Sequence, residues 1–515
     1  LGDVYKRQVQ AGGLGTRMRA LTTNKPKALI PVKNSPILFH LLGEFNRPED
    51  EFIIIGDYKY DVLDRYLSTF AKKQRYILIK SSVKGNASGI REALSYVPDN
   101  EPVLLVWSDL ILPEGFKNVI DACDLKGGCA IGTVDFPCSW RVENNQFVHE
   151  KGDKNGVAGL YVFANKSLLD TVPVEGSFTT WLSEQKFPMQ ALRMDGCIDI
   201  GTIEAYQNVE TSQFRCRPYN HIEVKEHEVI KTGLTDEAKT FVLREISWYE
   251  KAQEYGFKHV PKLISKSPLT LSRVHGDNIF LAGLDEEGRA KALDKMCKAL
   301  AALHQCGKAS ADAWDLYQEY FTKTIDRLRS IATALPFAER STIRINGKDC
   351  PNVLRNLELF RRCVLETLMD THYALYHGDC QLTNTLIDKS GDIFFIDPRG
   401  YFGKTKNIGD IRYDWVKVYY AIVGNFDQFN VKNFELKLDE DEVTFSIGSS
   451  GWESLVKQFF DQIPADEGTE KEIKLIHAIV WLSLASHAWE DFDSMCVAFY
   501  NGTALFAEWM ENYRG

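Results

Sequence analysis

Short apolar runs alternate with amphipathic segments over the first 210 residues, and this alternation restricts the fold more than any other feature of the chain. The runs FIII, YILI and VLLV are bounded by polar or turn residues, as strands are, and they cover Phe52–Ile55, Tyr76–Ile79 and Val103–Val106. Tyr60–Ala71 and Ala87–Tyr96, which lie between them, have the spacing of amphipathic helices. Strands that alternate with helices predict an α/β fold with βαβ units and a mostly parallel sheet, whose ligands bind at the carboxyl ends of the strands.

The pattern changes in the second part of the chain. Two short strand candidates, His221–Lys225 and His227–Lys231, precede a predicted helix over Glu237–Tyr255. Long helical patterns dominate from Ala290 to the end, with an interruption at Ala374–Gly403. This order predicts an α+β domain in which a small β-containing lobe is followed by a helical lobe.

Two domains therefore describe the chain. We place the first at 1–212 and the second at 213–515, with its small lobe near 213–280 and its helical lobe near 281–515. A length of 515 residues exceeds what one hydrophobic core supports, which agrees with this division.

Composition narrows the class of partner. A net charge of −10 provides no general basic footprint for nucleic acid, so we expect none as a partner. The eleven cysteines form no CxxC pair and no zinc-like spacing, as is typical of reduced thiols in a cytosolic protein. No stretch reaches the roughly 20 apolar residues of a membrane span, and we expect no signal peptide. We predict a cytoplasmic protein that acts on small molecules; the sequence does not indicate its oligomeric state.

The first ten residues, LGDVYKRQVQ, are largely polar although they precede a glycine-rich segment. In βαβ folds a phosphate loop follows a buried strand, and the buried strands of a parallel sheet are apolar. We therefore expect residues 1–8 to be foreign to the protein from which the following segment comes, and the chain to be less active than its motifs indicate.

The segment AGGLGTRM, Ala11–Met18, is the first candidate for phosphate binding. Glycines let the backbone approach a triphosphate closely, and consecutive N–H groups form a nest for its oxygens. Arg17 can add bidentate hydrogen bonds, and Lys27 can add a point charge. The nucleotide-binding candidates in this loop are Ala11, Gly12, Gly13, Gly15 and Thr16.

The complete string AGGLGTRMRALTTNKPKALIPV resembles the start of the sugar-phosphate nucleotidyltransferase family. The resemblance implies a Rossmann-like α/β/α sandwich that transfers a nucleotidyl group from an NTP to a sugar phosphate and releases pyrophosphate. Further segments resemble later elements of the family in the same order: Gly85-Asn86-Ala87, Trp107–Leu110, Glu150-Lys151, Gly159–Phe163 and Asp199–Thr202.

The resemblance implies a binding role for two of these segments. Gly85, Asn86 and Ala87 would line the nucleobase, and Asn86 departs from the threonine of the family. Glu150 and Lys151 would contact the sugar and its phosphate, although a glycine follows Lys151 where the family has proline.

The resemblance also implies the catalytic set. Asp109 and Asp199 would hold Mg²⁺ against the α-phosphate and the acceptor phosphate. Arg17 would steady the leaving pyrophosphate and Lys27 the developing charge, so positioning and electrostatics carry the reaction.

A second motif, HGDCQLTN, has the form H-G-D-x-x-x-x-N, and twenty residues after His377 the apolar run IFFI ends in Asp397. Kinase-type catalysis needs an aspartate that orients and deprotonates a hydroxyl, an asparagine on Mg²⁺ and a second aspartate on Mg²⁺. The pattern predicts Asp379 as the catalytic base and Asn384 and Asp397 as the metal ligands, with a structural role for His377.

This region resembles the aminoglycoside phosphotransferase and choline kinase superfamily, which has the two-lobed protein-kinase-like fold. The resemblance implies a small-lobe lysine on the nucleotide phosphates and a helix glutamate that holds it, for which Lys231 and Glu245 are the natural pair. Arg399 either contacts phosphate or pairs with an acid. Asp410 and Asp414, in GDIRYDWVK, resemble a structural element of the family.

The two motifs fit one reaction sequence, because a kinase makes a phosphomonoester and a nucleotidyltransferase consumes one. We expect a bifunctional enzyme that uses Mg²⁺, ATP and a second NTP (CTP, UTP, dTTP or GTP), with a nucleotide sugar for surface polysaccharide as the favoured product. The first alternative is a choline kinase joined to a phosphocholine cytidylyltransferase, and the second is a non-catalytic regulatory protein. A choline site needs an aromatic cage, for which the candidates are Trp415, Tyr419, Tyr420, Trp481 and Trp489.

Overall fold

A computed structural model gives the fold of residues 6–13, 15–45, 50–83, 85–144, 146–209 and 219–514. The chain divides into two compact units. Unit 1 comprises Leu1–Thr211 with the short segments Thr333–Leu335 and Glu490–Asp493, and unit 2 comprises the remaining residues. The domain boundary that the sequence predicts, at residue 212, lies outside the described residues.

Unit 1 is built on a mixed sheet with nine strands in the described residues. Its strands β5, β4, β1 and β6 are parallel, β11 runs antiparallel to β6 and to β8, and β12 lies parallel to β8. The strands are β1 (Lys6–Gln10), β4 (Glu51–Gly56), β5 (Arg75–Lys80), β6 (Val103–Trp107), β8 (Cys129–Val134), β9 (Arg141–Glu143), β10 (Gln146–Val148), β11 (Gly156–Phe163) and β12 (Met189–Arg193).

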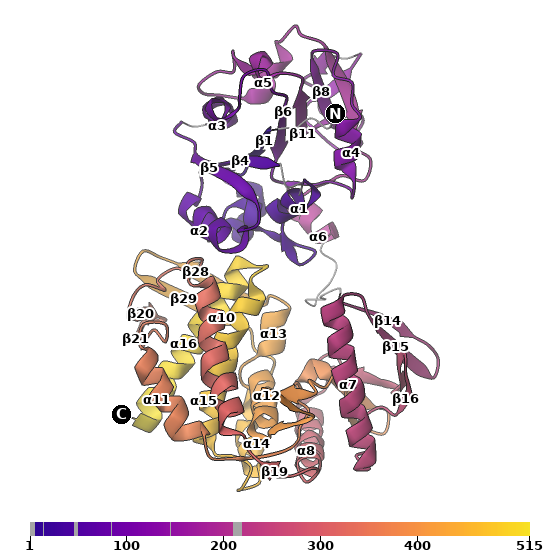
Figure 1. The fold of residues 1–515 in the computed structure, drawn as a ribbon, viewed down its shortest axis with the longest axis vertical. Helices are drawn as coiled ribbons and strands as arrows, with labels where there is room; N and C mark the ends of the chain where they lie inside the picture. The colour runs from indigo at the N-terminus through magenta and orange to yellow at the C-terminus, as the bar shows by residue number, and fades with distance from the viewer. Residues whose placement is uncertain are drawn as a thin grey trace. The chain divides into compact units, whose positions relative to one another are not determined.

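Helices cover both faces of this sheet. The alternate side chains Ile53, Ile55, Val103 and Leu105 form one core cluster with residues of α3 and α5, as the period of two in a strand requires. Figure 1 shows α1 and α2 on the opposite side of the sheet from α3 and α5. The predicted α/β class is thus confirmed. The helices of unit 1 are α1 (Ile37–Glu44), α2 (Tyr60–Phe70), α3 (Asn86–Ala93), α4 (Phe116–Asp121), α5 (Phe178–Ser183) and α6 (Ile203–Val209).

The central strand β1 contains Lys6, Arg7 and Gln8, which belong to the segment 1–8 that we expect to be foreign, followed by Val9 and Gln10. Its backbone pairs with β4 and β6 on both sides, so Arg7 and Gln8 are buried, with exposed fractions of 1% and 0%. Arg7 forms an ion pair with Asp50 at 2.5 Å, whereas neither amide atom of the Gln8 side chain has a hydrogen-bond partner among the described residues. Residues 1–5 lie outside the described residues.

Unit 2 has the two lobes that the sequence predicts. The small lobe is an antiparallel sheet in the order β14-β15-β17-β16, and α7 (Asp236–Glu254) packs against β15 and β16. Figure 1 shows α7 beside this sheet. The strands are β14 (Asn220–Val224), β15 (Glu228–Gly233), β16 (Leu263–Lys266) and β17 (Leu269–Ser272).

The second lobe of unit 2 is mainly helical and carries two short sheets beside its central loop. Strands β18 (Gly276–Asn278), β23 (Thr385–Asp388) and β24 (Ile393–Phe395) form one of them, and β19 (Ala309–Ser310), β22 (His372–Leu375) and β27 (Ile408–Asp410) form the other. The helices are α8 (Glu286–Leu303), α9 (Ala313–Tyr317), α10 (Lys323–Ile331), α11 (Leu357–Leu368), α12 (Arg412–Ile422), α13 (Phe426–Asn430), α14 (Val456–Gln462), α15 (Glu470–Leu484) and α16 (Phe492–Arg514).

A further four-stranded sheet in this lobe was not predicted from the sequence. It has the order β21-β20-β29-β28 and combines two hairpins that lie about 90 residues apart in the chain. Its strands are β20 (Thr342–Ile345), β21 (Lys348–Pro351), β28 (Phe434–Leu438) and β29 (Glu442–Ile447).

Among the described residues, no helix combines the length and the apolar character that a membrane span requires.

Candidate active sites

The glycine-rich loop of unit 1 follows β1 directly, at the carboxyl ends of the parallel strands. Ala11 donates its N–H to a carbonyl oxygen of β4 at 2.8 Å, which anchors the start of the loop. A Cβ atom at Gly12 would lie 2.8 Å from Asp57, whereas one at Gly13 would meet nothing within 4 Å, so the loop is closed on one side and open at Gly13. Gly15 has φ +61, in the left-handed region that favours glycine. These features suit a backbone that approaches phosphate groups.

Lys27, Asp109 and Asp199 lie together beside this loop. Lys27 Nζ donates to Asp109 Oδ2 at 2.6 Å. The short strands β7 (Leu110–Ile111) and β13 (Ile198–Asp199) pair directly after Asp109 and so bring Asp199 next to it. Burial, and then the charge of Asp109, raise the pKa of Asp199 to about 6, against the opposing effect of Lys27 and Arg17.

The two carboxylates fit a divalent cation. Asp199 Oδ1 is buried and accepts no hydrogen bond from the described residues, and a hard cation such as Mg²⁺ is bound by one or two carboxylates together with phosphate oxygens. No group of three or more His, Cys, Asp and Glu side chains lies at metal-binding distance in the described part of the chain. The assignment of Asp109 and Asp199 as metal ligands stays a prediction.

Thr16 and Arg17 are exposed at the start of the 3₁₀ helix Thr16–Thr22, which follows the loop. The Arg17 charge reaches Asp199, because it opposes the rise in the pKa of that carboxyl. The role of Arg17 at the pyrophosphate stays a prediction.

The segment Gly85-Asn86-Ala87 begins α3. Gly85 has φ +107, and a Cβ atom there would lie 2.6 Å from the carbonyl oxygen of Gly176. The amide oxygen of the Asn86 side chain accepts a hydrogen bond from the Phe178 N–H at 2.9 Å. Asn86, which departs from the family pattern, thus links α3 to α5, and its contact with a nucleobase stays a prediction.

Glu150 and Lys151 are exposed in the segment between β10 and β11. Glu150 lies 3.5 Å from the guanidinium of Arg141. In the described structure neither side chain forms a hydrogen bond or ion pair with Asp109 or Asp199, and their sugar-binding role stays a prediction.

In unit 2 the Asp379 carboxylate is held on both oxygens. Lys417 Nζ lies 2.8 Å from Asp379 Oδ1, and Asn384 donates its side-chain N–H to Asp379 Oδ2 at 2.8 Å. The structure thus places Asp379 and Asn384 together as the spacing predicted. Lys417, on α12, was missed. The available signal was a lysine in the run Trp415–Ile422, whose other residues are apolar or aromatic.

Asp414 holds the backbone of the loop that carries Asp379. Its two carboxylate oxygens accept the N–H groups of His377 and Gly378 at 2.7 and 2.6 Å. His304 lies between Asp414 and Glu467, at 3.1 and 2.7 Å. Burial lowers the pKa of His304, but hydrogen bonds and the charges of the two acids outweigh it and raise the value to about 9.

His377 is fully buried in this loop, and burial lowers its pKa. The Asp379 N–H donates to His377 Nδ1 at 3.3 Å. This packing agrees with a structural role.

Lys231, Glu245 and Asp397 form a chain of charges between the lobes of unit 2. Lys231 Nζ lies 2.6 Å from Glu245 Oε1 and 2.9 Å from Asp397 Oδ1. Burial raises the pKa of Glu245 to about 7, against the opposing charge of Lys231. Asp397 has φ +59, a conformation that costs energy in a residue with a side chain and that is concentrated at functional sites.

These residues also fit a magnesium ion. The Asn384 side chain donates its N–H to Asp379, and its amide oxygen accepts no hydrogen bond within the described residues. Half of the Asp397 side chain is exposed. Two oxygen ligands of this kind are what Mg²⁺ takes from a kinase.

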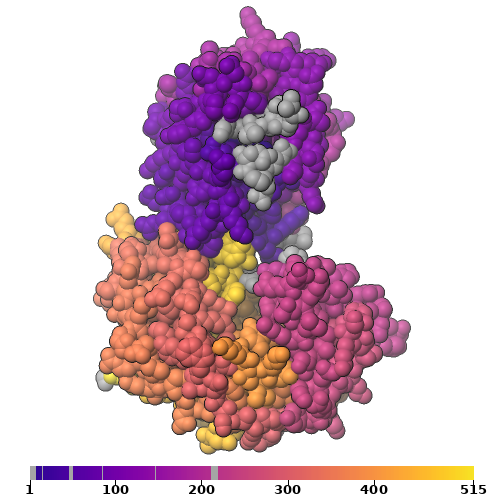
Figure 2. Space-filling view, viewed as in Figure 1, coloured from indigo at the N-terminus to yellow at the C-terminus, as the bar shows by residue number. Residues whose placement is uncertain are grey.

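A cavity of about 1170 Å³ contains these groups. Figure 2 shows a recess between the small lobe, in magenta, and the helical lobe, in orange. Asp379, Asn384 and Asp397 contribute to its lining. The helical lobe and the loop after Asp397 add basic and aromatic side chains, namely Lys323, Arg327, Arg399, Lys417, Tyr401, Tyr413, Tyr420 and Phe426.

The aromatic residues proposed for a choline cage do not surround an open space in this cavity. Trp415 and Trp481 are fully buried in the core. Tyr420 stacks on Phe426 with ring centroids 4.5 Å apart, and Lys417 Nζ lies 4.8 Å from the Tyr420 ring centroid. The ammonium group of Lys417 therefore already lies against the rings of Tyr420 and Phe426, where the ammonium group of choline would have to bind.

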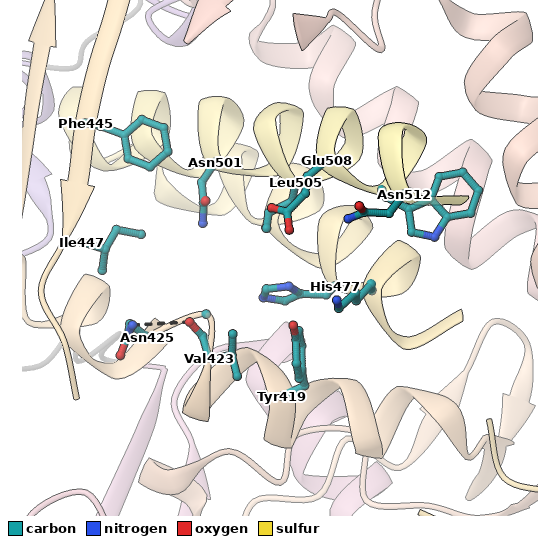
Figure 3. A pocket seen from close by; sticks show the side chains of 13 residues that line it. Tyr419, Val423, Asn425, Phe445, Ile447, His477, Asn501, Leu505, Glu508 and Asn512 are labelled. Atoms are coloured by element: carbon teal, nitrogen blue, oxygen red, sulfur yellow. Dashed lines mark hydrogen bonds between the residues drawn. The ribbon is translucent and has the colours of Figure 1, made fainter. Parts of the chain in front are cut away.

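A second, smaller cavity of about 250 Å³ shares no lining residue with the first. Figure 3 shows Asn501, Glu508 and Asn512 projecting from α16 toward His477 and Tyr419. Trp481 donates its indole N–H to His477 Nε2 at 3.0 Å, and burial lowers the His477 pKa to about 3, so the ring is neutral. Tyr419 of the predicted cage lies here and not beside Asp379.

The geometry thus describes two phosphate-handling sites, one in each unit, and comparison with known proteins agrees. Residues 9–146 match the family described as nucleotidyl transferase, and residues 229–430 match the phosphotransferase enzyme family. The chain therefore contains a nucleotidyl transferase domain followed by a domain of the phosphotransferase enzyme family.

Curated relatives match the first part of the chain. The catalytic subunit beta of mannose-1-phosphate guanylyltransferase from Dictyostelium discoideum is 27% identical over 208 residues, which cover 36% of this chain and 56% of that protein. Glucose-1-phosphate cytidylyltransferase from Salmonella typhimurium is 25% identical over 223 residues, which cover 37% and 85%. The chain spans about half the length of the guanylyltransferases it matches.

Two solved structures are also similar. HddC from Yersinia pseudotuberculosis, complexed with GMP-PN, has 21% identity and a TM-score of 0.35, covering 40% of this chain and 99% of that one. The CTP:phosphocholine cytidylyltransferase of Streptococcus pneumoniae has 17% identity and a TM-score of 0.33, covering 40% and 98%.

Proposed function

We propose that the chain is a bifunctional enzyme. Unit 2 phosphorylates a hydroxyl group of a small acceptor with ATP, and unit 1 transfers a nucleotidyl group from a second NTP to the phosphate so formed. The observation that supports the proposal is that each unit brings candidate phosphate-handling side chains together. These are Lys27, Asp109 and Asp199 in unit 1 and Lys231, Asp379, Asn384 and Asp397 in unit 2. We place the enzyme in the cytoplasm, where both nucleotides are available.

In unit 1 the acceptor phosphate attacks the α-phosphorus of the NTP, a new P–O bond forms, and the bond to pyrophosphate breaks. Lys27, held by Asp109 at 2.6 Å, supplies positive charge where the transition state gains negative charge. Arg17 binds the leaving pyrophosphate, and the loop at Gly13 lets backbone N–H groups reach the phosphates. Asp109 and Asp199 would hold Mg²⁺, which neutralises phosphate charge when bound.

In unit 2 Asp379 orients the acceptor hydroxyl and takes its proton as the oxygen attacks the γ-phosphorus of ATP. A P–O bond to the acceptor forms, the bond from the γ-phosphorus to the β–γ bridging oxygen breaks, and ADP leaves. Lys417 and Asn384 fix the carboxylate for this task. Lys231, paired with Glu245, binds the ATP phosphates. Asn384 and Asp397 would hold Mg²⁺, which screens the charge of the phosphates when bound.

We favour a sugar as the acceptor, phosphorylated on its anomeric hydroxyl, and a nucleotide sugar for surface polysaccharide as the product. Two of the relatives are named for mannose 1-phosphate and glucose 1-phosphate. Choline is disfavoured because Lys417 already occupies the aromatic pair of Tyr420 and Phe426. A second cation there would be repelled.

A substrate panel tests the proposal. ADP release is measured with free sugars and amino alcohols as acceptors, and pyrophosphate release with sugar 1-phosphates and phosphocholine in the presence of CTP, UTP, dTTP or GTP. We expect turnover of at least one sugar and of its 1-phosphate. Turnover of choline and phosphocholine alone would replace the sugar with choline. Nucleotide binding without any turnover would favour the non-catalytic alternative.

A further inference from the structure

Three basic side chains line one wall of the unit 2 cavity, and two of them share a single carboxylate. Glu319 accepts hydrogen bonds from Lys323 at 2.6 Å and from Arg399 at 2.8 Å. Arg399 and Lys323 outweigh the effect of burial and hold the pKa of Glu319 at about 2, so this acid is ionised. Arg399 therefore pairs with an acid, one of the two roles that the sequence left open for it.

Arg327 is the third cation, and it has no carboxylate partner among the described residues. Its guanidinium donates to the hydroxyl of Ser483 at 2.6 Å. Burial, and then the charge of Arg399, lower the pKa of Lys323 to about 7, as excess positive potential does. At neutral pH Lys323 is therefore only partly protonated, but Arg327 and Arg399 alone carry more positive charge than Glu319 balances. A bound anion would balance this excess and favour the charged form of Lys323.

The local fold aims these side chains at the cavity. Lys323 and Arg327 are four residues apart on α10 and so lie on one face of the helix. A single π-helical turn, Gln318–Thr322, joins α9 to α10, and such turns are frequent at functional sites. Lys323, Arg327 and Arg399 line the same cavity as Asp379.

The acids of the catalytic centre do not neutralise this wall. Asp379 is paired with Lys417, and Asp397 shares Lys231 with Glu245. In the described residues none of these acids forms an ion pair with the cations of this wall. The nucleotide phosphates have Lys231 and two candidate magnesium ligands of their own. The cations on α10 are therefore available for the other substrate.

We infer that Lys323, Arg327 and Arg399 form an anion-binding subsite, which holds a phosphate or carboxylate group of the acceptor away from the hydroxyl that is phosphorylated. This inference rests on the proposed kinase function and adds the chemical class of the acceptor: a sugar that already carries an anionic group. A neutral sugar leaves the excess charge unbalanced, and a quaternary ammonium is repelled.

Two measurements on the full chain test the subsite. In the first, inorganic phosphate is titrated calorimetrically into protein saturated with a non-hydrolysable ATP analogue. In the second, kcat/KM for ADP release is compared between glucose and glucose 6-phosphate, mannose and mannose 6-phosphate, and galactose and galacturonate, with choline as the cationic acceptor. The variants are Arg327→Gln, Arg327→Lys, which keeps the charge, and Arg329→Gln, which removes an exposed arginine from the same helix.

We expect the wild type to bind one phosphate ion that Arg327→Gln does not bind. We also expect kcat/KM of the wild type to be higher for each anionic acceptor than for its neutral counterpart and for choline. Arg327→Gln should lower kcat/KM for them by roughly 30-fold or more and leave KM for ATP unchanged. Arg327→Lys should keep most of the binding, and Arg329→Gln should match the wild type.

Equal phosphate binding by the wild type and Arg327→Gln would overturn the subsite, as would preference for neutral or cationic acceptors. A rise in KM for ATP with unchanged acceptor discrimination would assign the cluster to the nucleotide instead and also overturn it. If no acceptor is phosphorylated, the kinase proposal fails, and the phosphate titration still decides whether the subsite exists.

Discussion

Gln8 lies in the middle of β1, where the strands on both sides exclude water from its side chain. Both of its amide atoms are buried without a hydrogen-bond partner in the described residues. An unsatisfied buried polar group loses its hydrogen bonds to water and gains nothing in return. Gln8 therefore destabilises the sheet that supports the glycine-rich loop.

Replacing Gln8 with valine, which is smaller and favours strands, should raise the free energy of unfolding of unit 1 by about 1–3 kcal/mol. Calorimetric unfolding measures the shift. The control is Gln146→Val on β10, because Gln146 is exposed and its change should stay within about 0.5 kcal/mol. Equal shifts in the two variants would mean that burial of the amide is not the cause.

His304 shows how a buried residue can make stability depend on pH. Its pKa is raised to about 9 between Asp414 and Glu467, above the ordinary value of 6.5. The folded state therefore binds a proton that the unfolded state releases between these values. The resulting stabilisation is complete below pH 6.5 and is lost as the pH rises through 9.

We expect the difference in unfolding free energy between the wild type and His304→Gln to be constant below pH 6.5. Between pH 6.5 and 9 it should fall by about 3 kcal/mol, since each pKa unit is worth about 1.4 kcal/mol. Denaturant unfolding at several pH values measures this. His275→Gln, at an exposed histidine, should leave the profile of the wild type unchanged, and a flat difference for His304→Gln would refute the ion-pair account.

At the scale of elements, α12 positions the catalytic loop of unit 2. Asp414, in the first turn of this helix, accepts two backbone N–H groups of the loop, and Lys417, one turn further on, pairs with Asp379. One helix thus fixes both the backbone of this loop and the carboxylate of Asp379, the proposed catalytic base.

The change Asp414→Asn removes the charge and one acceptor from this brace. We expect kcat of the kinase reaction to fall by roughly 100-fold, because small displacements of a catalytic group have effects of that size. Pyrophosphate release by unit 1 should be unchanged. Asp326→Asn, at an exposed aspartate on α10, serves as the control and should retain full kinase activity; an equal loss in both variants would contradict the role of the brace.

Elements with strong local patterns could be predicted from the sequence. The runs FIII, YILI and VLLV lie in β4, β5 and β6, and the predicted helix Glu237–Tyr255 agrees with α7 within one residue at each end. The sheet of β20, β21, β28 and β29 could not be predicted, because its two hairpins pair across a long sequence separation. Local periodicity contains no information about such pairing.

The residues of the candidate sites also fall into two groups, those that the sequence could indicate and those that it could not. The spacing of HGDCQLTN and of the apolar run that follows it predicted that Asp379, Asn384 and Asp397 belong to one site. The family resemblance pointed to Lys231 and Glu245, and the structure places these two side chains in contact. The roles of all five residues stay predictions. Lys323 and Arg327 could not be found, because only the folded chain brings α10 to the loop after Asp397.

For the whole molecule, net charge is a poor guide to ligands. The chain has a net charge of −10, yet one wall of its unit 2 cavity has an excess of cations. Charge over the surface affects solubility and association, whereas recognition depends on the few groups that line a cavity. An acidic protein can therefore select an anionic acceptor.

Because each unit contains its own set of functional residues, the two activities should be separable. Asp109→Asn should lower pyrophosphate release by roughly 10²–10³-fold and leave ADP release intact, since it removes charge from the site of unit 1 only. Asp379→Asn should lower ADP release by roughly 10²–10⁴-fold and leave pyrophosphate release intact, since it removes the base of unit 2.

A mixture of the two variants should convert the free acceptor into the nucleotide product, because the phosphomonoester made by one protein is the substrate of the other. Loss of both activities in either variant would show that the sites are not independent, and a mixture that accumulates phosphomonoester would show that unit 1 acts on a different acceptor.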